Sequence, residues 1–250
     1  MRVADKMKSS ELENDIGESG LVHSSQTAPH PRLEMVLRRH LDTENQDPLK
    51  RATIEAHSAL KTLAGDLSVQ PFILDSGCGT GKSTQMLARQ YPEHLVIGAD
   101  RSSHRLAKCG VTSGISRVGN CILMRAGLSS LWRLLLRDGY FPEYHFLLYP
   151  NPYPKPAHLL RRWHGHPVFP QLLMLGGRIE LRSNWEIYAV EFAEAVRIAT
   201  GHASGISQMK PESAISPFER KYHERGQSLF SVVVPERVTA AFRSTREGRI

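Results

Sequence analysis

The sequence predicts an α/β fold in which a mostly parallel sheet carries helices on both faces. From Pro71 onward, short apolar segments alternate with segments whose apolar residues recur at helical spacing. Such alternation is typical of a parallel sheet that is covered on both sides. The chain has 250 residues, of which 40% are hydrophobic, and this is enough for one large domain with a sizeable core.

The individual elements follow from local patterns. Between Arg32 and Ala64 apolar residues recur at helical spacing, and Pro48 divides the segment into two helices. Later helices are expected to begin near Lys82, Ser103, Ser130, Val168 and Trp185, with Ser103 and Asn184 as N-caps. The predicted strands are Phe72–Ser76, Leu95–Asp100, Asn120–Met124, Tyr144–Tyr149, Arg178–Arg182 and Ser228–Val234, the last as an antiparallel partner.

The two ends of the chain differ from this pattern. Residues 1–25 are polar and aperiodic, so we expect a disordered N-terminal segment before a domain at residues 26–234. Residues 235–250 carry four arginines without a core pattern and are expected to form a disordered basic tail.

Composition narrows the function classes. The net charge of +7 favours an anionic partner, and nucleic acid comes first because cationic side chains release counterions from phosphates. Three scattered cysteines are too few for a disulfide framework or a cysteine metal site. No apolar segment approaches the length of a membrane span. We therefore expect a cytoplasmic protein with no membrane partner and no metal.

The segment PFILDSGCGTGKST is a glycine-rich turn between a strand and a helix. A phosphate-binding P-loop needs glycine where this chain has Ser76, and a dinucleotide fingerprint needs glycine where it has Lys82. The remaining pattern, an acidic residue followed by Gly77, Gly79 and Gly81, resembles motif I of class I S-adenosylmethionine (SAM) methyltransferases. The cofactor predicted from this loop is SAM.

That resemblance implies roles for the residues around the loop. Asp75 would help to hold the amino-acid end of SAM, and the glycines would let the backbone approach it. Asp100 ends the second strand, where an acidic side chain can accept both ribose hydroxyls. Many such enzymes place an acidic residue beside the adenine, but this chain has Gly127. Backbone groups of Ala126 and Gly127 are expected to bond the adenine instead.

A stiff segment, here called the proline ledge (Asn151–Pro156), follows the fourth strand. Its three prolines fix the backbone at the end of the sheet where open α/β folds place their chemistry. Tyr153 and Trp163 offer ring faces for stacking on a base. The side chains expected to contact nucleic acid from this segment are Lys155, His158, Arg161 and Arg162.

The ledge and two later segments together resemble the tRNA (guanine-N7)-methyltransferase family. YPNPYPK followed by His158 and the Arg161–Arg162 pair is similar to the family's F-P-D-P-W-x-K…R-H…R-R. GGRI with SNWEIY is similar to its G-G…T-D-W-x-x-Y, and SPFERK to its T-x-F-E-x-[RK]. A further similarity, SQTAPH, lies near the N-terminus, so that the resemblance spans residues 25–234.

Membership would imply a Rossmann-like class I SAM methyltransferase fold with a seven-stranded sheet and a final antiparallel strand. The expected activity is methyl transfer from SAM to guanosine N7 in tRNA, by a monomer or homodimer. Asn151 would orient the base and Tyr153 stack on it, so these two are the candidate catalytic residues. Asn184 and Glu219 would face the guanine pocket.

Two family aspartates are replaced here, by Asn151 and Asn184. Guanine N7 has no proton to lose, so the reaction needs alignment rather than a general base. An amide at position 151 keeps one acceptor but loses a charged hydrogen bond, worth roughly 1.5–3 kcal/mol. Two alternatives remain open: a SAM- and RNA-binding protein with weak or lost activity, and an amino-directed methyltransferase of the N6-adenine type, which Asn151-Pro152-Tyr153 partly resembles.

Overall fold

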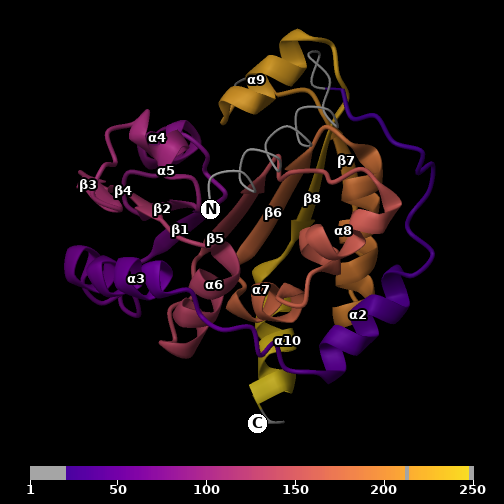
Figure 1. Ribbon diagram of the computed structural model, residues 1–250, viewed down its shortest axis with the longest axis horizontal. Coiled ribbons are helices and arrows are strands. Elements are labelled where there is room, and N and C mark those ends of the chain that lie inside the picture. Colours follow the sequence, from indigo (N-terminus) through magenta and orange to yellow (C-terminus); the bar gives the residue numbers. More distant parts are fainter. Residues whose placement is uncertain (1–20, 212–213, 248–250) are drawn as a thin grey trace, which may run out of the picture.

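The computed structural model describes residues 21–211 and 214–247, and within them eight strands form one sheet (Figure 1). Their order is β3-β4-β2-β1-β5-β6-β8-β7, and β4, β2, β1, β5 and β6 run parallel. The strands β3, β8 and β7 are antiparallel to their neighbours. Their bounds are β1 Phe72–Ser76, β2 Leu95–Asp100, β3 Ile115–Val118, β4 Cys121–Arg125, β5 Tyr144–Leu148, β6 Arg178–Ser183, β7 Ile206–Met209 and β8 Leu229–Val234.

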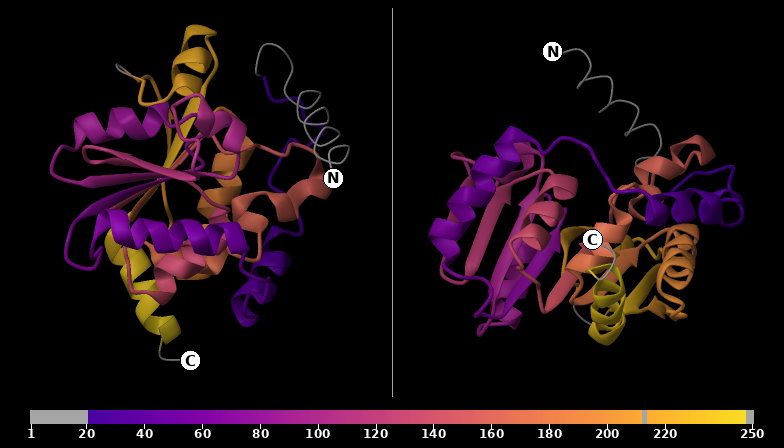
Figure 2. Two further views of the ribbon diagram at one scale, coloured as in Figure 1. Left: turned by 60° about the vertical axis from the view of Figure 1, so that its left-hand side comes forward. Right: turned by 90° about the horizontal axis from the view of Figure 1, so that it is seen from below.

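Helices cover both faces of this sheet because successive residues of a buried strand point to opposite sides. Ile73 of β1 belongs to a core cluster with residues of α4 (Lys82–Gln90) and α5 (Ser103–Ala107). Its neighbour Leu74 belongs to the larger cluster on the other face. The left view of Figure 2 shows the sheet between the two layers. The helices of the larger layer are α2 Leu33–Asp42, α3 Arg51–Ala64, α6 Leu128–Arg137, α7 Phe169–Leu175, α8 Glu186–Thr200 and α10 Glu236–Glu247.

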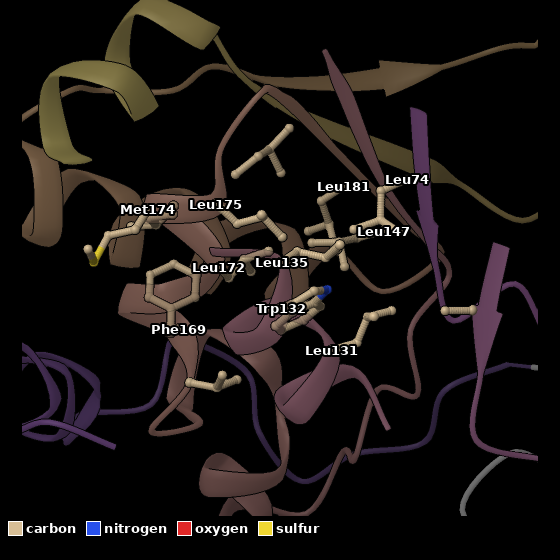
Figure 3. Packing of buried hydrophobic residues seen from close by; sticks show 14 of the residues in the cluster. Leu74, Leu131, Trp132, Leu135, Leu147, Phe169, Leu172, Met174, Leu175 and Leu181 are labelled. Atoms are coloured by element: carbon tan, nitrogen blue, oxygen red, sulfur yellow. The ribbon is translucent and has the colours of Figure 1, made fainter. Parts of the chain in front are cut away.

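The centre of the larger cluster lies where α6 and α7 meet the sheet. Trp132 of α6 is fully buried among leucines of both helices and of β1, β5 and β6 (Figure 3). Its indole nitrogen donates to the hydroxyl of Ser76, which also contacts His145 at 2.8 Å, so the one polar atom of the ring is satisfied. Burial lowers the pKa of His145 to about 3, so this imidazole is neutral at pH 7. The packing fixes the end of β1 from which the glycine loop departs.

The predicted α/β fold is confirmed, with eight strands in the described part of the chain where six were predicted from the residues and seven were implied by the family resemblance. The expected strands all form, with ends that shift by one residue at most. The edge strands β3 and β7, the helix α9 (Pro217–Glu224) and the short 3-10 helices η1 (Pro156–Arg161) and η2 (Trp163–Gly165) were not predicted. Two N-cap predictions were wrong: the hydroxyl of Ser102 accepts from the Arg105 amide, and Trp185 rather than Asn184 precedes α8.

The predicted disordered tail at residues 235–250 is contradicted up to Glu247, where α10 ends. Thr239 is fully buried and donates its hydroxyl to Gly177 O at 3.0 Å. Phe242 is 6% exposed and packs in the main cluster, and Arg243 donates to Met174 O at 2.6 Å. The helix forms because it packs against α7 and the end of β6, a tertiary contact that its composition does not reveal.

Two further expectations concern the ends of the chain and membranes. Most of the predicted disordered N-terminal segment, residues 1–20, lies outside the described residues. No helix within residues 21–211 and 214–247 is long and apolar enough to span a bilayer.

Candidate active site

The glycine loop leaves the carboxyl end of β1 in the conformation that its glycines allow. Gly77, Gly79 and Gly81 have φ values of 86°, 60° and 82°, a region that other residues rarely adopt. The amides of Gly77 and Cys78 both donate to Ala99 O, at 2.8 and 3.1 Å, which ties the loop to β2. A Cβ on Gly81 would lie 2.6 Å from Leu123, so this position also requires glycine for packing. Around Gly79 a Cβ would meet nothing within 4 Å, and the loop is open on that side.

Asp75 lies on β1, two residues before Gly77 of the loop, and is 1% exposed. Its Oδ2 accepts hydrogen bonds from the hydroxyls of Ser83 and Thr84, at 2.6 and 2.7 Å, and so fixes the first turn of α4. Its Oδ1 is buried and has no hydrogen-bond partner among residues 21–211 and 214–247. Burial raises the pKa of Asp75 to about 6, although the two hydroxyls oppose this. The carboxyl therefore keeps an unused acceptor, as a residue that contacts a bound ligand would.

Asp100 lies at the end of β2, the strand next to β1. Its Oδ2 accepts from the Gly79 amide at 3.0 Å and its Oδ1 from the Ser102 amide at 2.8 Å. Each carboxylate oxygen has a second lone pair, so both can still accept from a ligand hydroxyl. The structure thus brings Asp100 and the glycine loop together, as the sequence predicted.

The adenine contact predicted at Ala126 and Gly127 is corrected in part. These residues follow β4 and lie beside Asp100, since the Ala126 amide donates to Asp100 O at 3.0 Å. The Gly127 amide donates to the Thr53 hydroxyl at 3.0 Å. Both N–H groups are therefore engaged within the protein and cannot bond an adenine. Arg125, an exposed cation at the end of β4 in register with Asp100, was not predicted as a site residue. The predicted strand ended at Met124, so its position directly after that strand was the available signal.

These residues fit SAM. A SAM molecule needs a close backbone approach, a carboxylate for the ribose hydroxyls and polar groups at its amino-acid end. The open side of Gly79, the oxygens of Asp100 and the orphaned Oδ1 of Asp75 supply these groups at adjacent strand ends.

The proline ledge begins on the neighbouring strand. Asp75 of β1 is in register with Phe146 of the parallel strand β5, so the glycine loop and the segment that leads into the ledge leave adjacent strands at the same edge of the sheet. Residues 151–155 are non-helical, as predicted, and η1 begins at Pro156. The sheet therefore places the ledge beside the candidate cofactor site.

Within the ledge the candidate catalytic residues contact each other. Asn151 Oδ1 accepts from the Tyr153 amide at 3.3 Å, and Tyr153 has a φ of 44°, a strained value for a residue with a side chain. The Tyr153 ring lies 6.1 Å from the His158 ring, edge to face, and 5.8 Å from the Arg161 guanidinium. Arg161 and Lys155 are exposed. The predicted catalytic residue Tyr153 thus lies beside two predicted substrate-binding residues, His158 and Arg161.

Arg162 is different, and its predicted phosphate contact is wrong because its side chain is fully buried. Its guanidinium donates to Tyr153 O at 3.0 and 3.1 Å, and its carbon Cζ lies 4.9 Å from the Trp185 ring centroid. It also donates to Gln26 Oε1 at 2.9 Å. Arg162 thus stabilises the strained backbone of Tyr153 through two hydrogen bonds to its carbonyl oxygen. It also joins the ledge to Gln26, 136 residues earlier in the chain.

Glu191 of α8 is the counter-ion of Arg162, 2.6 Å away and equally buried. It also accepts from His164 at 2.8 Å, from the Gln26 amide group at 2.6 Å and from the His30 backbone at 2.8 Å. Burial alone would raise the pKa of Glu191, but the hydrogen bonds and charges of His164 and Arg162 lower it to about 2. The sequence analysis missed this residue, although an acidic residue between buried apolar positions of a helix was a signal.

Glu219 and Asn184 lie apart from the open surface. Glu219 is fully buried, where it pairs with Arg182 at 2.9 Å and accepts from the Tyr149 hydroxyl at 3.0 Å. It therefore supports Tyr149 rather than facing substrate, contrary to prediction. Burial, with the Glu219 charge, raises the pKa of Tyr149. Asn184 is half-buried and donates to Gln227 at 3.0 Å.

Comparisons with known proteins agree with this geometry. The family model Methyltransf_4, described as "Putative methyltransferase", matches residues 69–232. The tRNA (guanine-N(7)-)-methyltransferase of Neisseria meningitidis serogroup B is 27% identical over 165 residues, 65% of this chain and 68% of that protein. Its counterpart in Klebsiella pneumoniae is 28% identical over 172 residues, 65% and 71% of the two chains.

A solved structure of an antibiotic-related methyltransferase has a TM-score of 0.50 at 15% identity, covering 71% of this chain and 92% of that one. This likeness concerns the fold alone. The family match covers well over half of the chain and includes every strand-end residue of the cofactor site. The resemblance read from the motifs is confirmed, and the chain belongs to this family of SAM-dependent methyltransferases.

Proposed function

We propose that this methyltransferase transfers the methyl group of SAM to N7 of a guanosine in tRNA. The observation that carries the proposal is the position of the ledge, which follows β5 at the same edge of the sheet at which the glycine loop follows the neighbouring strand β1. The curated relatives, which bear the name tRNA (guanine-N(7)-)-methyltransferase, support the choice of base and substrate.

The chemistry asks little of the protein beyond alignment. Bound SAM supplies a methyl group on a positively charged sulfur, and guanine N7 supplies an unprotonated lone pair. The protein therefore has to bring the two into line and to exclude other ring atoms, which is catalysis by proximity and orientation. No side chain has to remove a proton from N7.

The ledge residues would orient the base. Asn151 Oδ1 can accept from a guanine N–H donor, because its bond to the Tyr153 amide is long, at 3.3 Å, and leaves a lone pair free. The Tyr153 ring would stack on the base, and the Arg161 guanidinium lies over the Tyr153 ring. Exposed Lys155 and Arg161 would meet phosphates and fix the register of the RNA.

Transfer of label from methyl-labelled SAM to unmodified tRNA tests the proposal. Borohydride and aniline cleave RNA at 7-methylguanosine, so labelled tRNA should break at one guanosine. Label that resists this cleavage and is found in N6-methyladenosine would instead favour the amino-directed alternative. Absence of transfer despite SAM binding would favour a binding protein.

Asn151 itself supplies a matched pair of variants. Asn151→Asp restores the carboxylate and with it a charged hydrogen bond to guanine, so we expect a rate increase of about ten- to a hundredfold. Asn151→Ala should lower the rate. Equal rates for the wild type and both variants would exclude residue 151 from base recognition.

A further inference from the structure

The helix α9 stands apart from the layers that build the core. It lies at the top of Figure 1, away from α3, α6 and α10. None of its residues belongs to either hydrophobic core cluster. Only Glu219 and Tyr222 of α9 are buried, whereas Phe218 is 46% exposed. Keeping a phenylalanine in solvent forgoes the free energy that its burial would contribute.

The helix is nevertheless firmly placed beside the ledge. The Ser216 hydroxyl caps its N-terminus by accepting from the Glu219 amide at 3.1 Å. The Glu219 carboxylate, buried against Arg182, accepts from the hydroxyl of Tyr149. The rings of Tyr149 and Tyr222 lie 5.5 Å apart. Since Tyr149 stands two residues before Asn151, α9 is anchored to the start of the ledge.

The outer side of α9 combines a ring face with cations. Phe218 is stacked near Tyr222, at 6.1 Å and 28°, and the Lys221 ammonium lies 5.8 Å from the Tyr222 centroid. Lys221 follows Phe218 by three residues and shares its face of the helix, whereas the exposed Arg220 follows it by two and points to another side. The one exposed acidic residue within Pro217–Arg225 is Glu224. Because Arg182 neutralises the buried Glu219, the surface charge of this helix is positive.

We infer that α9 is an RNA-contacting surface next to the active site, in which Phe218 stacks on an unpaired base and Lys221 meets the adjoining phosphates. This inference rests on the proposed tRNA substrate and adds a second RNA-binding surface to the proline ledge. An exposed ring with flanking cations is the combination that binds single-stranded RNA: the ring meets the face of any base, and the cations follow the backbone. A protein partner with an apolar groove would gain nothing from the cations.

Binding of unmodified tRNA, measured by fluorescence anisotropy, tests the inference separately from methyl transfer. Phe218→Ala should raise the Kd for tRNA about five- to a hundredfold, since base stacking on an aromatic side chain has that worth. Phe218→Trp should retain wild-type affinity. Val118→Ala, which removes a more exposed apolar residue at the far β3 edge of the sheet, is the matched control and should leave the Kd unchanged.

A second variant tests the cations. Lys221→Ala should reduce the slope of log K against log salt by about one unit, whereas Lys108→Ala, which removes an exposed lysine at the end of α5, should not. Thermal unfolding of each variant confirms that the helix is intact, and SAM affinity should be unchanged in all of them.

The outcomes separate the two proposals. If the wild type methylates tRNA but Phe218→Ala binds it like Val118→Ala, the α9 inference is wrong and the proposed function stands. If the wild type binds no tRNA, both are wrong. If Phe218→Ala converts a dimer into monomers without changing tRNA affinity, α9 serves a second copy of the chain instead.

Discussion

The buried pair of Arg162 and Glu191 gives a sharp prediction for Glu191→Gln. The wild-type carboxylate accepts from Arg162 and His164 on one oxygen and from Gln26 and His30 on the other. A glutamine must replace one of these oxygens with an NH₂ group, which cannot accept. In either orientation of the glutamine amide, its NH₂ group faces two N–H donors of the protein and neither of them has an acceptor. The positive charge of Arg162 is also left buried without its counter-ion.

The magnitude follows from the burial. Removing one partner of a fully buried ion pair costs about 3–5 kcal/mol. For a domain of this size each kcal/mol lowers the Tm by about 2–4 °C, so Glu191→Gln should lower it by roughly 6–20 °C. Glu194→Gln is the matched control on the same helix, because its pair with Arg197 is exposed and is worth less than about 1 kcal/mol.

The pH dependence gives the prediction a sign. The pKa of Glu191 is about 2 in the folded protein and near its ordinary value of 4.5 in the unfolded chain, so its stabilising contribution is complete above pH 4.5 and is lost as the pH falls toward 2. The difference in unfolding free energy between wild type and Glu191→Gln should therefore narrow over that range. Thermal and denaturant unfolding measure both effects. Equal stability of Glu191→Gln and Glu194→Gln at pH 7 would refute the reasoning.

Three further predictions follow from the site and the fold. Asp100→Asn should weaken SAM binding about ten- to a hundredfold through its lost charged hydrogen bonds, and calorimetry that found unchanged affinity would contradict the ribose assignment. Arg161→Ala should weaken tRNA binding and flatten its salt dependence, whereas Arg162→Ala should instead lower the Tm; similar behaviour of the two variants would refute their separate placement. Phe242→Ala should cost about 3–5 kcal/mol of stability and Ser244→Ala under about 0.5, and comparable unfolding midpoints would mean that α10 is not packed.

The sequence predicted the elements that position the cofactor site most accurately. The bounds of β1 and β2 are those expected, because strands buried on both faces are continuous apolar segments with sharp ends. The edge strands β3 and β7 contain exposed or half-exposed residues, so their composition resembles that of loops and they were missed. The carboxylates at positions 75 and 100 could be placed because their strands could.

Side-chain burial beyond the strands could not be predicted in the same way. Arg161 and Arg162 are chemically identical neighbours, and only the turn after η1 decides that one faces solvent and the other Glu191. Glu219 likewise matched a family motif, but whether it faces a ligand depends on Arg182 of a neighbouring strand. In α10 four apolar residues, Val238, Ala240, Ala241 and Phe242, lie among arginines without a recognisable core pattern, and the helix is stabilised by its packing on α7.

Nucleoside analysis of unmodified tRNA, after incubation with the protein and methyl-labelled SAM, decides whether guanine N7 receives the methyl group. We expect label in 7-methylguanosine, with the signal lost in a variant that carries both Asp100→Ala and Asn151→Ala. Label in any other nucleoside, or SAM binding without transfer to tRNA under any condition, would contradict the proposed function.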